Sequence, residues 1–264
     1  MQARSNDAPL ALQLERVSQR YGDLWAVRDL TLAVGTGSVV GLIGPNGSGK
    51  TTTIRLATGL LRVPVDSVRI SGVDLAREPV RAKRLFALVP DAPTGFEHLS
   101  VSEYLGLYGS LHEGDDGYRS RCATLLNAMQ LSSHEHRLLG TLSAGMRRKV
   151  SMIAAASIFA PLLVVDEATS ALDPESVMVL EELLRFAADN GHAAFVATQD
   201  LDFAERACDI VFLMAKGQVV ASGTPNDLRS KYGCGSLREV FAKATGLSDL
   251  IGGIGRELAR TITR

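Results

Sequence analysis

The chain has 264 residues, 46% of them hydrophobic, which is enough to build one large domain around a substantial core. Its formal net charge of −1 excludes the basic field that drives nucleic-acid binding, so we expect no nucleic-acid partner. The three cysteines, Cys122, Cys208 and Cys234, lack metal-ligand spacing and are typical of isolated thiols in a reduced, cytoplasmic setting.

Taken in chain order, the first part of the sequence predicts short strands and one helix, and the last part predicts strands that alternate with helices. Strands alternating with helices indicate a mainly parallel sheet covered by helices, so the predicted fold class is α/β. The predicted strands are 11–17, 38–44, 85–90, 161–166, 192–198 and 209–215, and the predicted helices include 51–61 and one that follows Pro174.

The pattern changes over residues 91–149, which read as helices and polar loops inserted into the sheet. The longest apolar stretch, 150–165, is divided by Pro161 and is too short to span a bilayer, so we expect a helix followed by a buried strand. In the tail, residues 246–264, apolar residues fall at helical spacing but several glycines weaken that helix. A helix docked on the body and a membrane or partner anchor both remain open for this tail.

The segment GPNGSGKT, which begins at Gly44, fits the pattern G-x-x-x-x-G-K-[ST] between a predicted strand and a predicted helix. Gly44, Gly47 and Gly49 let the backbone curl so that its N–H groups converge on phosphate oxygens. The start of the following helix adds partial positive charge. Lys50 is expected to reach the β- and γ-phosphates and Thr51 to offer its hydroxyl to Mg²⁺. A plain glycine-rich turn is the alternative, which the Lys-Thr pair in register disfavours.

The predicted strand PLLVVDE, residues 161–167, ends in two carboxylates. Asp166 is expected to hold Mg²⁺ directly or through water. Glu167 is expected to point elsewhere and to orient and activate a water molecule. Two solvated acids at a strand end are the alternative, which a phosphate loop in the same chain disfavours.

With these motifs together, residues 10–245 resemble the ATP-binding subunits of ABC transporters, and look closest to cassettes made as separate chains for exporter-type membrane subunits. TLSAGMRRK, 141–149, resembles the family signature, usually Leu-Ser-Gly-Gly-Gln, and SALD, 170–173, resembles the D-loop. YGDLWAVRDL places Tyr21 where the family has an aromatic residue that stacks on adenine. LVPDAPT occupies the Q-loop position and VATQD the switch position.

The resemblance implies a P-loop NTPase core with an N-terminal β subdomain, within a single ATP-binding domain over residues 1–245. It implies ATP and Mg²⁺ as cofactors, and a head-to-tail dimer with a second ABC ATP-binding subunit, identical or different. The implied nucleotide-binding residues are Tyr21, Gly44, Pro45, Asn46, Gly47, Ser48, Gly49, Lys50, Thr51, Thr52, Ser143, Ala144 and Gly145. The implied metal ligands are Thr51, Asp91 and Asp166, and the implied catalytic residues are Glu167, Gln199 and Asp91.

In the signature, Ser143 is expected to cap a helix and to bond a γ-phosphate, and Gly145 to permit close backbone approach. Arg147, Arg148 and Lys149 are expected to form a solvated or membrane-facing helix face.

Four positions depart from the family pattern: Ala144 and Met146 replace a signature Gly and Gln, Asp91 stands where the Q-loop has Gln, and Gln199 replaces the switch His. Asp91 still supplies an oxygen for Mg²⁺ or water. Gln199 keeps an amide donor and a carbonyl acceptor but cannot be protonated. Because the loss of one preorganised donor costs about 10²–10³ in rate and Glu167 is intact, we expect slow hydrolysis.

These observations predict an ATPase that drives a separate integral-membrane subunit, with export as the expected direction, held at the inner face of the cell membrane by that subunit. The helical insertion, from Asp91 through the segment near Tyr104 and Tyr108, is expected to contact it. The reason is the set of apolar residues beside the Q-loop, Phe96, Leu99, Val101 and Tyr104. One alternative is a degenerate regulatory half of a heterodimer with little hydrolysis. Another is a soluble ABC protein acting on ribosomes or DNA, which usually carries two cassettes or long insertions. The sequence does not identify the cargo.

Overall fold

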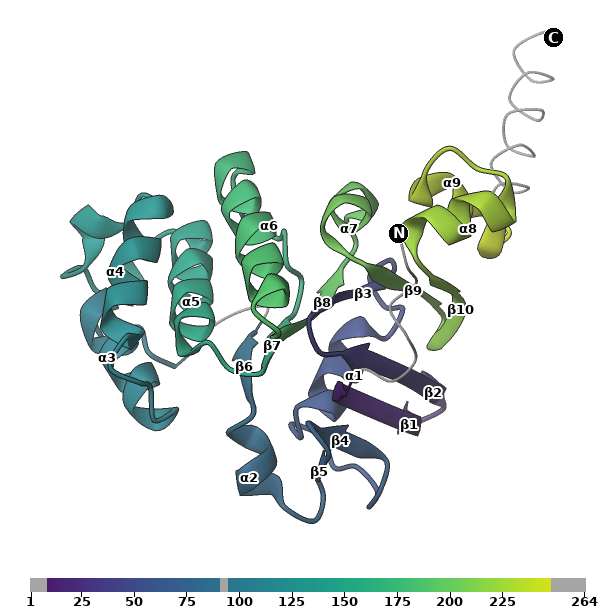
Figure 1. Ribbon diagram of the computed structural model, residues 1–264, viewed down its shortest axis with the longest axis horizontal. Helices are drawn as coiled ribbons and strands as arrows, with labels where there is room; N and C mark the ends of the chain where they lie inside the picture. The colour runs from purple at the N-terminus through teal and green to yellow at the C-terminus, as the bar shows by residue number, and fades with distance from the viewer. Residues whose placement is uncertain (1–8, 91–94, 248–264) are drawn as a thin grey trace, which may run out of the picture.

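The computed structural model describes residues 9–90 and 95–247, and its central layer is a six-stranded sheet (Figure 1). The strand order is β10-β9-β3-β8-β7-β6, and every neighbouring pair is parallel except β9 with β10. This arrangement confirms the predicted α/β class. The strands are β3 (Val39–Ile43), β6 (Phe86–Val89), β7 (Leu162–Val165), β8 (Ala193–Thr198), β9 (Ile210–Ala215) and β10 (Gln218–Gly223).

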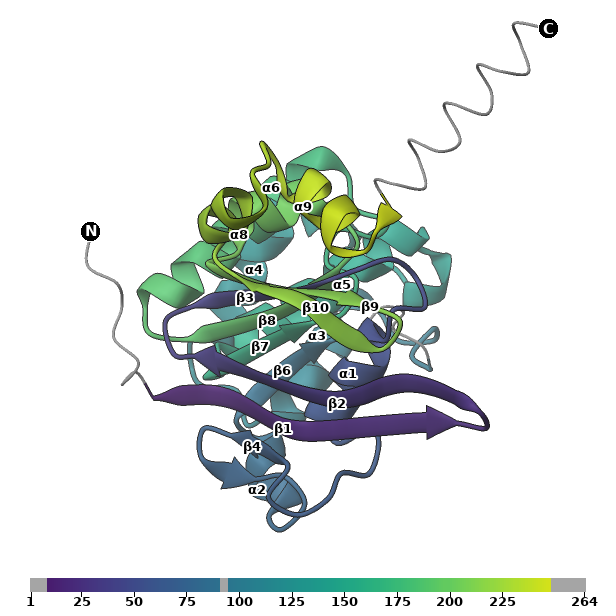
Figure 2. The same cartoon turned by 90° about the vertical axis from the view of Figure 1, so that its right-hand side faces the viewer.

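A second, antiparallel sheet of order β2-β1-β4-β5 forms the N-terminal part of the molecule. Its strands are β1 (Leu10–Tyr21), β2 (Leu24–Gly35), β4 (Val68–Ile70) and β5 (Val73–Asp74). Helix α1 (Lys50–Ala57) packs between the two sheets (Figure 2). The predicted helix over 51–61 is too long, because Gly59 adopts a left-handed φ of 69° and ends the helix just beyond Ala57.

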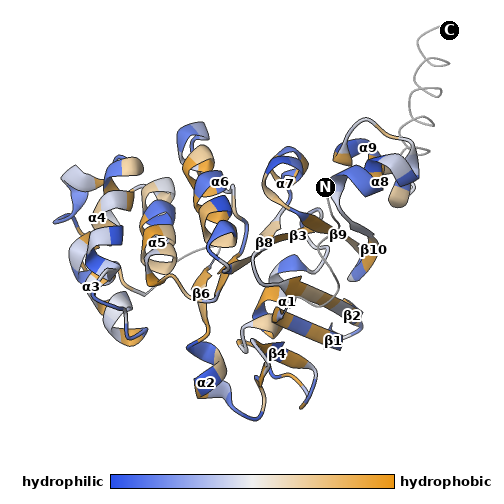
Figure 3. Cartoon of the chain, viewed as in Figure 1, coloured by the Kyte–Doolittle hydropathy of each residue, from blue (hydrophilic) through white to orange (hydrophobic). Residues whose placement is uncertain are grey.

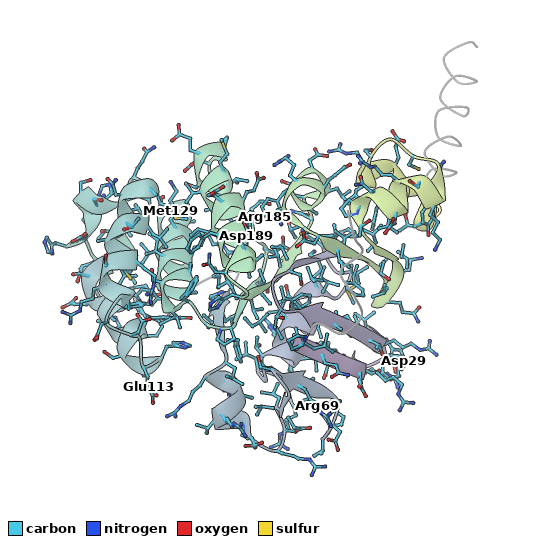
Figure 4. The ribbon with its side chains drawn as sticks, viewed as in Figure 1. Asp29, Arg69, Glu113, Met129, Arg185 and Asp189 are labelled. Atoms are coloured by element: carbon cyan, nitrogen blue, oxygen red, sulfur yellow. The ribbon has the colours of Figure 1, made fainter. Side chains whose placement is uncertain are left out.

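Helices cover the other face of the six-stranded sheet (Figure 1). Those in contact with the sheet are α5 (Ala144–Ile158), α6 (Pro174–Asp189), α7 (Leu201–Ala207) and α8 (Pro225–Tyr232). Helices α3 (Val101–Leu111) and α4 (Tyr118–Ala128) pack against α5, α9 (Leu237–Ala244) packs against α7 and α8, and α2 (Pro79–Lys83) precedes β6. Two 3₁₀ turns, Ser132–His134 and Leu139–Thr141, connect α4 to α5. Helices α3, α4 and α5 lie in the expected insertion, and Met129, at the end of α4, is buried among them (Figure 4). Helix α5 runs through position 149, where the insertion was expected to end.

Alternate residues of the central strands enter two different cores. Leu162 and Val164 of β7 pack with α1 and the antiparallel sheet, whereas Leu163 and Val165 pack with the helical layer. Both faces of these strands are therefore apolar, which explains why β7 and β8 read as continuous hydrophobic runs. Figure 3 colours the chain by the hydropathy of each residue. Polar side chains begin only where the strands end.

Three of these strand ends meet at one edge of the sheet. Strand β8 lies between β3 and β7, with Ile43 opposite Thr198 and Val165 opposite Val196. The segments that follow β3, β7 and β8 therefore emerge side by side at the carboxyl edge, where ligands bind in open parallel sheets. These segments begin at Gly44, Asp166 and Gln199.

Candidate active site

The loop between β3 and α1 is shaped by close contacts that leave no room for side chains at two glycines. A Cβ on Gly44 would lie 2.3 Å from the carbonyl oxygen of Met214, and a Cβ on Gly49 would lie 2.2 Å from that of Ala26. Gly49 also has a left-handed φ of 108° directly before α1. The loop thus needs these glycines because β9 and β2 press against its backbone as well as because it must turn.

Lys50 begins α1 and is almost completely buried. Its Nζ donates to the carbonyl oxygens of Gly44 at 2.8 Å and Pro45 at 3.2 Å, and it lies 3.0 Å from Oε1 of Glu167. An ammonium group has three N–H donors. Every donor of Lys50 therefore has a protein acceptor, and a phosphate that binds Lys50 must replace at least one of them.

Thr51 and Asp166 meet across the same edge of the sheet. The hydroxyl of Thr51 donates to Oδ1 of Asp166 at 3.3 Å, and Asp166 is itself 4% exposed. The backbone N–H of Asp166 donates to the carbonyl of Val89 at 2.9 Å, which ties the end of β7 to β6. A hydroxyl beside a carboxylate is the arrangement by which P-loop proteins hold Mg²⁺ together with phosphate oxygens.

Glu167 adopts a left-handed backbone conformation, with φ of 49°. This turn directs its carboxylate toward Lys50, and the Glu167 side chain is only 14% exposed. Glu167 was expected to point away from the Asp166 group, but in the structure both carboxylates contact phosphate-loop residues. A non-glycine residue with positive φ is strained, and such strain concentrates at functional sites.

Gln199 directly follows β8, and its side chain is exposed. Its neighbour Thr198 is fully buried, and the Thr198 carbonyl accepts from the N–H of Gly44 at 3.3 Å. The Thr198 hydroxyl lies 3.4 Å from that of Thr169, beyond β7. These contacts place Gln199 beside the start of the phosphate loop, at the carboxyl edge of the sheet.

The residues at this edge fit a nucleotide with Mg²⁺. The hydroxyl of Ser48 is buried, and among residues 9–90 and 95–247 no hydrogen-bond partner reaches it, so a phosphate oxygen would satisfy it. The glycine cradle brings backbone N–H groups to the start of α1. Thr51 and Asp166 supply a hydroxyl and a carboxylate oxygen, the hard ligands that Mg²⁺ prefers.

The signature residues begin α5. Ser143 is its N-cap, and its hydroxyl accepts from the N–H of Met146 at 3.2 Å, as predicted for a capping serine. A Cβ on Gly145 would lie 2.6 Å from the carbonyl of Ala171, so here this glycine permits contact with the D-loop of its own chain. In the described part of the chain, no hydrogen bond joins Ser143 to the phosphate loop.

The expectation that Arg147, Arg148 and Lys149 form a solvated or membrane-facing face is wrong for Arg148, which is 2% exposed. Its guanidinium donates to the carbonyls of Pro90, Asp166 and Glu167. Spacing offered a signal for this burial, because Arg148 shares one helix stripe with the buried Met152 and Ala155.

Lys149 is also largely covered, at 13% side-chain exposure, and lies 2.6 Å from Oδ2 of Asp173. This ion pair and the N–H of Ser176 hold the pKa of the Asp173 carboxyl well below its usual range. Asp173 caps α6 through Ser176 at 2.9 Å. The pair therefore connects the signature helix to the D-loop.

Tyr21 ends β1 in a hairpin whose second strand touches the phosphate loop. The Tyr21 side chain is 46% exposed, and its neighbour Arg20 lies over the ring of Trp25, with the guanidinium carbon 5.6 Å from the ring centroid. Ala26, next along β2, supplies the carbonyl that presses on Gly49. The hairpin tip therefore lies near the start of α1.

Two further expectations concern Asp91 and the residues around the start of α3. Asp91 lies outside the described residues, as does the tail from residue 248. Val101 and Tyr104 cannot form the expected contact surface, because they are 0% and 6% exposed and belong to the core. Phe96 remains exposed at 38%, with its ring centroid 5.4 Å from that of Tyr104.

The family to which the chain belongs follows from comparison with known proteins. A family model described as ABC transporter matches residues 27–170. The daunorubicin/doxorubicin resistance ATP-binding protein DrrA of Streptomyces peucetius is 33% identical over 259 residues, which covers 96% of this chain and 77% of that protein. The Nod factor export ATP-binding protein I of Cupriavidus pinatubonensis is 32% identical, over 84% of this chain and 69% of that protein.

A solved ATP-binding subunit of an ABC transporter superposes with a TM-score of 0.83 at 32% identity, over 89% of this chain and 99% of that one. A nucleotide-free ATP-binding cassette at 20% identity, with a TM-score of 0.69, shares the fold. The chain belongs to the ABC transporter family, as one of its ATP-binding cassettes. Of these two relatives, one is named for drug resistance and the other for Nod factor export.

Proposed function

We propose that this chain binds ATP with Mg²⁺, hydrolyses it, and drives a separate transmembrane subunit that exports a substrate. The observation that carries the proposal is the meeting of Lys50 with Glu167, at 3.0 Å, beside Thr51 with Asp166, at 3.3 Å. In the described part of the chain, no helix is long and apolar enough to cross a membrane. In this proposal a separate transmembrane subunit carries out the membrane step and holds this chain at the inner face of the cell membrane.

The proposed division of roles follows from the contacts. Bound Mg²⁺ neutralises charge on the β- and γ-phosphates. The phosphate-loop amides and Lys50 bind and orient the γ-phosphate, and Thr51 and Asp166 hold the metal ion. Glu167 orients a water molecule and accepts its proton, and Gln199 contributes an amide beside the phosphate loop. Tyr21 stacks on the adenine, and Asp91 supplies a further oxygen for Mg²⁺ or for water.

A second cassette completes each site in this proposal. Ser143, Ala144 and Gly145 lie at the start of α5, where the helix N-terminus favours an anion. Since Ser143 is exposed at that end, it is free to meet the γ-phosphate held by a partner cassette, identical or different. We propose that Phe96, which is exposed in the helical insertion, contacts the transmembrane subunit.

Turnover of the purified chain with Mg²⁺ and ATP tests the enzymatic part, with Lys50→Ala as the inactive control. Gln199 at the switch position favours a second candidate function, in which the chain is a regulatory cassette that binds ATP and hydrolyses little. Phosphate release no faster than that of Lys50→Ala, with intact ATP binding, would establish this second candidate. The proposed coupling to a transmembrane subunit is tested by copurification with an integral-membrane protein and by a cross-link from Phe96 to that protein.

A further inference from the structure

Arg148 is buried between two strand ends of the candidate site although it belongs to the signature helix α5. One guanidinium nitrogen, Nη1, donates to the carbonyl of Pro90, the residue after β6. The other, Nη2, donates to the carbonyls of Asp166 and of Glu167, the latter at 2.9 Å, directly after β7. One side chain thus contacts both strand ends that carry candidate catalytic residues.

The geometry of the guanidinium makes these contacts restrictive. Its N–H donors lie in one plane at fixed angles, so bonds to three carbonyls set the relative position of all three. Lysine at this position would keep the charge but would lack the planar set of donors that bonds the carbonyls of two strand ends at once. Arg148 therefore fixes the backbone on which Glu167 is mounted.

The backbone at Glu167 depends on such support. Its φ of 49° is unfavourable for a residue with a side chain and persists only where surrounding contacts hold it. Neighbouring bonds run from Asp166 N to Val89 O at 2.9 Å and from Ala168 N to Ala197 O at 3.0 Å. The bond from Arg148 holds the carbonyl of Glu167 itself, and the Glu167 carboxylate lies beside Lys50.

We propose that Arg148 is a positioning residue, which sets the Glu167 carboxylate beside Lys50 and makes that placement depend on where α5 lies. The proposal rests on the proposed function, in which Glu167 activates water. Because α5 begins at the signature residues, a shift of this helix is transmitted to Glu167 through one side chain. The same side chain holds Pro90, directly before Asp91.

The test compares Arg148→Lys and Arg148→Met with Arg147→Lys, a control on the same helix whose Nη1 donates to the carbonyl of Leu142 at 2.6 Å. We expect both Arg148 variants to lower kcat at least 10-fold while ATP with Mg²⁺ binds at least as tightly as to the parent, because a displaced Glu167 competes less for Lys50, and Lys should retain more activity than Met. Arg147→Lys should change both quantities less than about 2-fold. An Arg148→Lys variant with the parent kcat, or a parallel loss of kcat and ATP binding, would overturn the proposal.

Amide hydrogen exchange supplies a readout that needs no hydrolysis. In Arg148→Met, the amides of residues 166–168 should exchange at least 10-fold faster, while those of β8 keep the parent rate. Equal acceleration in both segments would show general destabilisation and would overturn the positioning role. If the parent chain binds ATP but releases no phosphate above the Glu167→Gln level, the hydrolysis in the proposed function is refuted. In that case, the amide hydrogen exchange rate of residues 166–168 in Arg148→Met is the measurement that tests the Arg148 proposal.

Discussion

Replacing Glu167 by Gln should strengthen ATP binding while it stops turnover. In the structure, Oε1 of Glu167 occupies one donor of Lys50 at 3.0 Å, in surroundings where the two side chains are 14% and 3% exposed. The γ-phosphate needs that same ammonium group, so the Glu167 carboxylate competes with the nucleotide for Lys50. The neutral amide of Gln competes less and does not repel the phosphate.

The expected size follows from hydrogen-bond energies. A bond to a charged partner contributes about 1.5–3 kcal/mol and a neutral one about 0.5–1.5 kcal/mol. The difference of about 1–1.5 kcal/mol corresponds to roughly 10-fold tighter binding of ATP. Removal of the water-activating group should lower kcat by about 10²–10⁴. ATP that is bound but not hydrolysed should also hold two chains together.

The assay measures the Kd for ATP by filter binding at low temperature, phosphate release at saturating ATP, and the elution volume with and without ATP. Glu182→Gln, on the exposed surface of α6, is the matched control and should behave as the parent does. If Glu167→Gln binds ATP no more tightly than the parent while its fold is intact, Glu167 does not compete for Lys50. If its turnover equals that of the parent, the water-activating group lies elsewhere.

Three further predictions concern the phosphate loop, the switch position and the signature. Lys50→Ala should weaken ATP binding at least about 10-fold, because a contact contributing about 1.5–3 kcal/mol is removed; a Kd within about twofold of the parent would refute the phosphate-loop assignment. Gln199→His should raise kcat about 10-fold, or about 1.4 kcal/mol of barrier, and an unchanged rate in a folded variant would favour the regulatory cassette. Gly145→Ala should lower Tm by about 2–8 °C, because its Cβ would lie 2.6 Å from the carbonyl of Ala171 and overpacking costs about 1–3 kcal/mol. Ala144→Gly is the control, and a Tm equal to that of the parent in Gly145→Ala would show that the contact relaxes freely.

The sequence was sufficient for those features that depend on local pattern. Buried strands such as β7 and β8 are continuous apolar runs with a polar residue at the end, so their existence and the position of Asp166 could be predicted. The carboxyl ends of parallel strands lie at one edge of a sheet, but the structure alone shows that β7 and β8 are neighbours. The family match confirms the class of protein, while the individual roles of Tyr21, Asp91 and Gln199 remain predictions.

Features that depend on contacts between distant segments could not be predicted. The helical spacing of Arg148 with apolar residues indicated that it could be buried. The carbonyls of Pro90 and Glu167 that accept from its guanidinium come from distant segments, and no local pattern indicated them. Likewise, no local pattern indicates that Met214 would press its carbonyl against Gly44. The end of α1 was misjudged because Leu60 and Leu61 continue an apolar run beyond a left-handed glycine.

The position of β3 in the sheet has a consequence for how the molecule is made. Both neighbours of β3, the strands β8 and β9, come from residues 193–215, whereas the phosphate loop follows β3 at residue 44. During synthesis on the ribosome, about 150 residues must be added before β3 gains its first partner strand. Contacts so distant in sequence close slowly, because the entropy of the intervening chain must be lost first. We therefore expect the phosphate loop to acquire its final shape late, after β8 and β9 have emerged and docked beside β3.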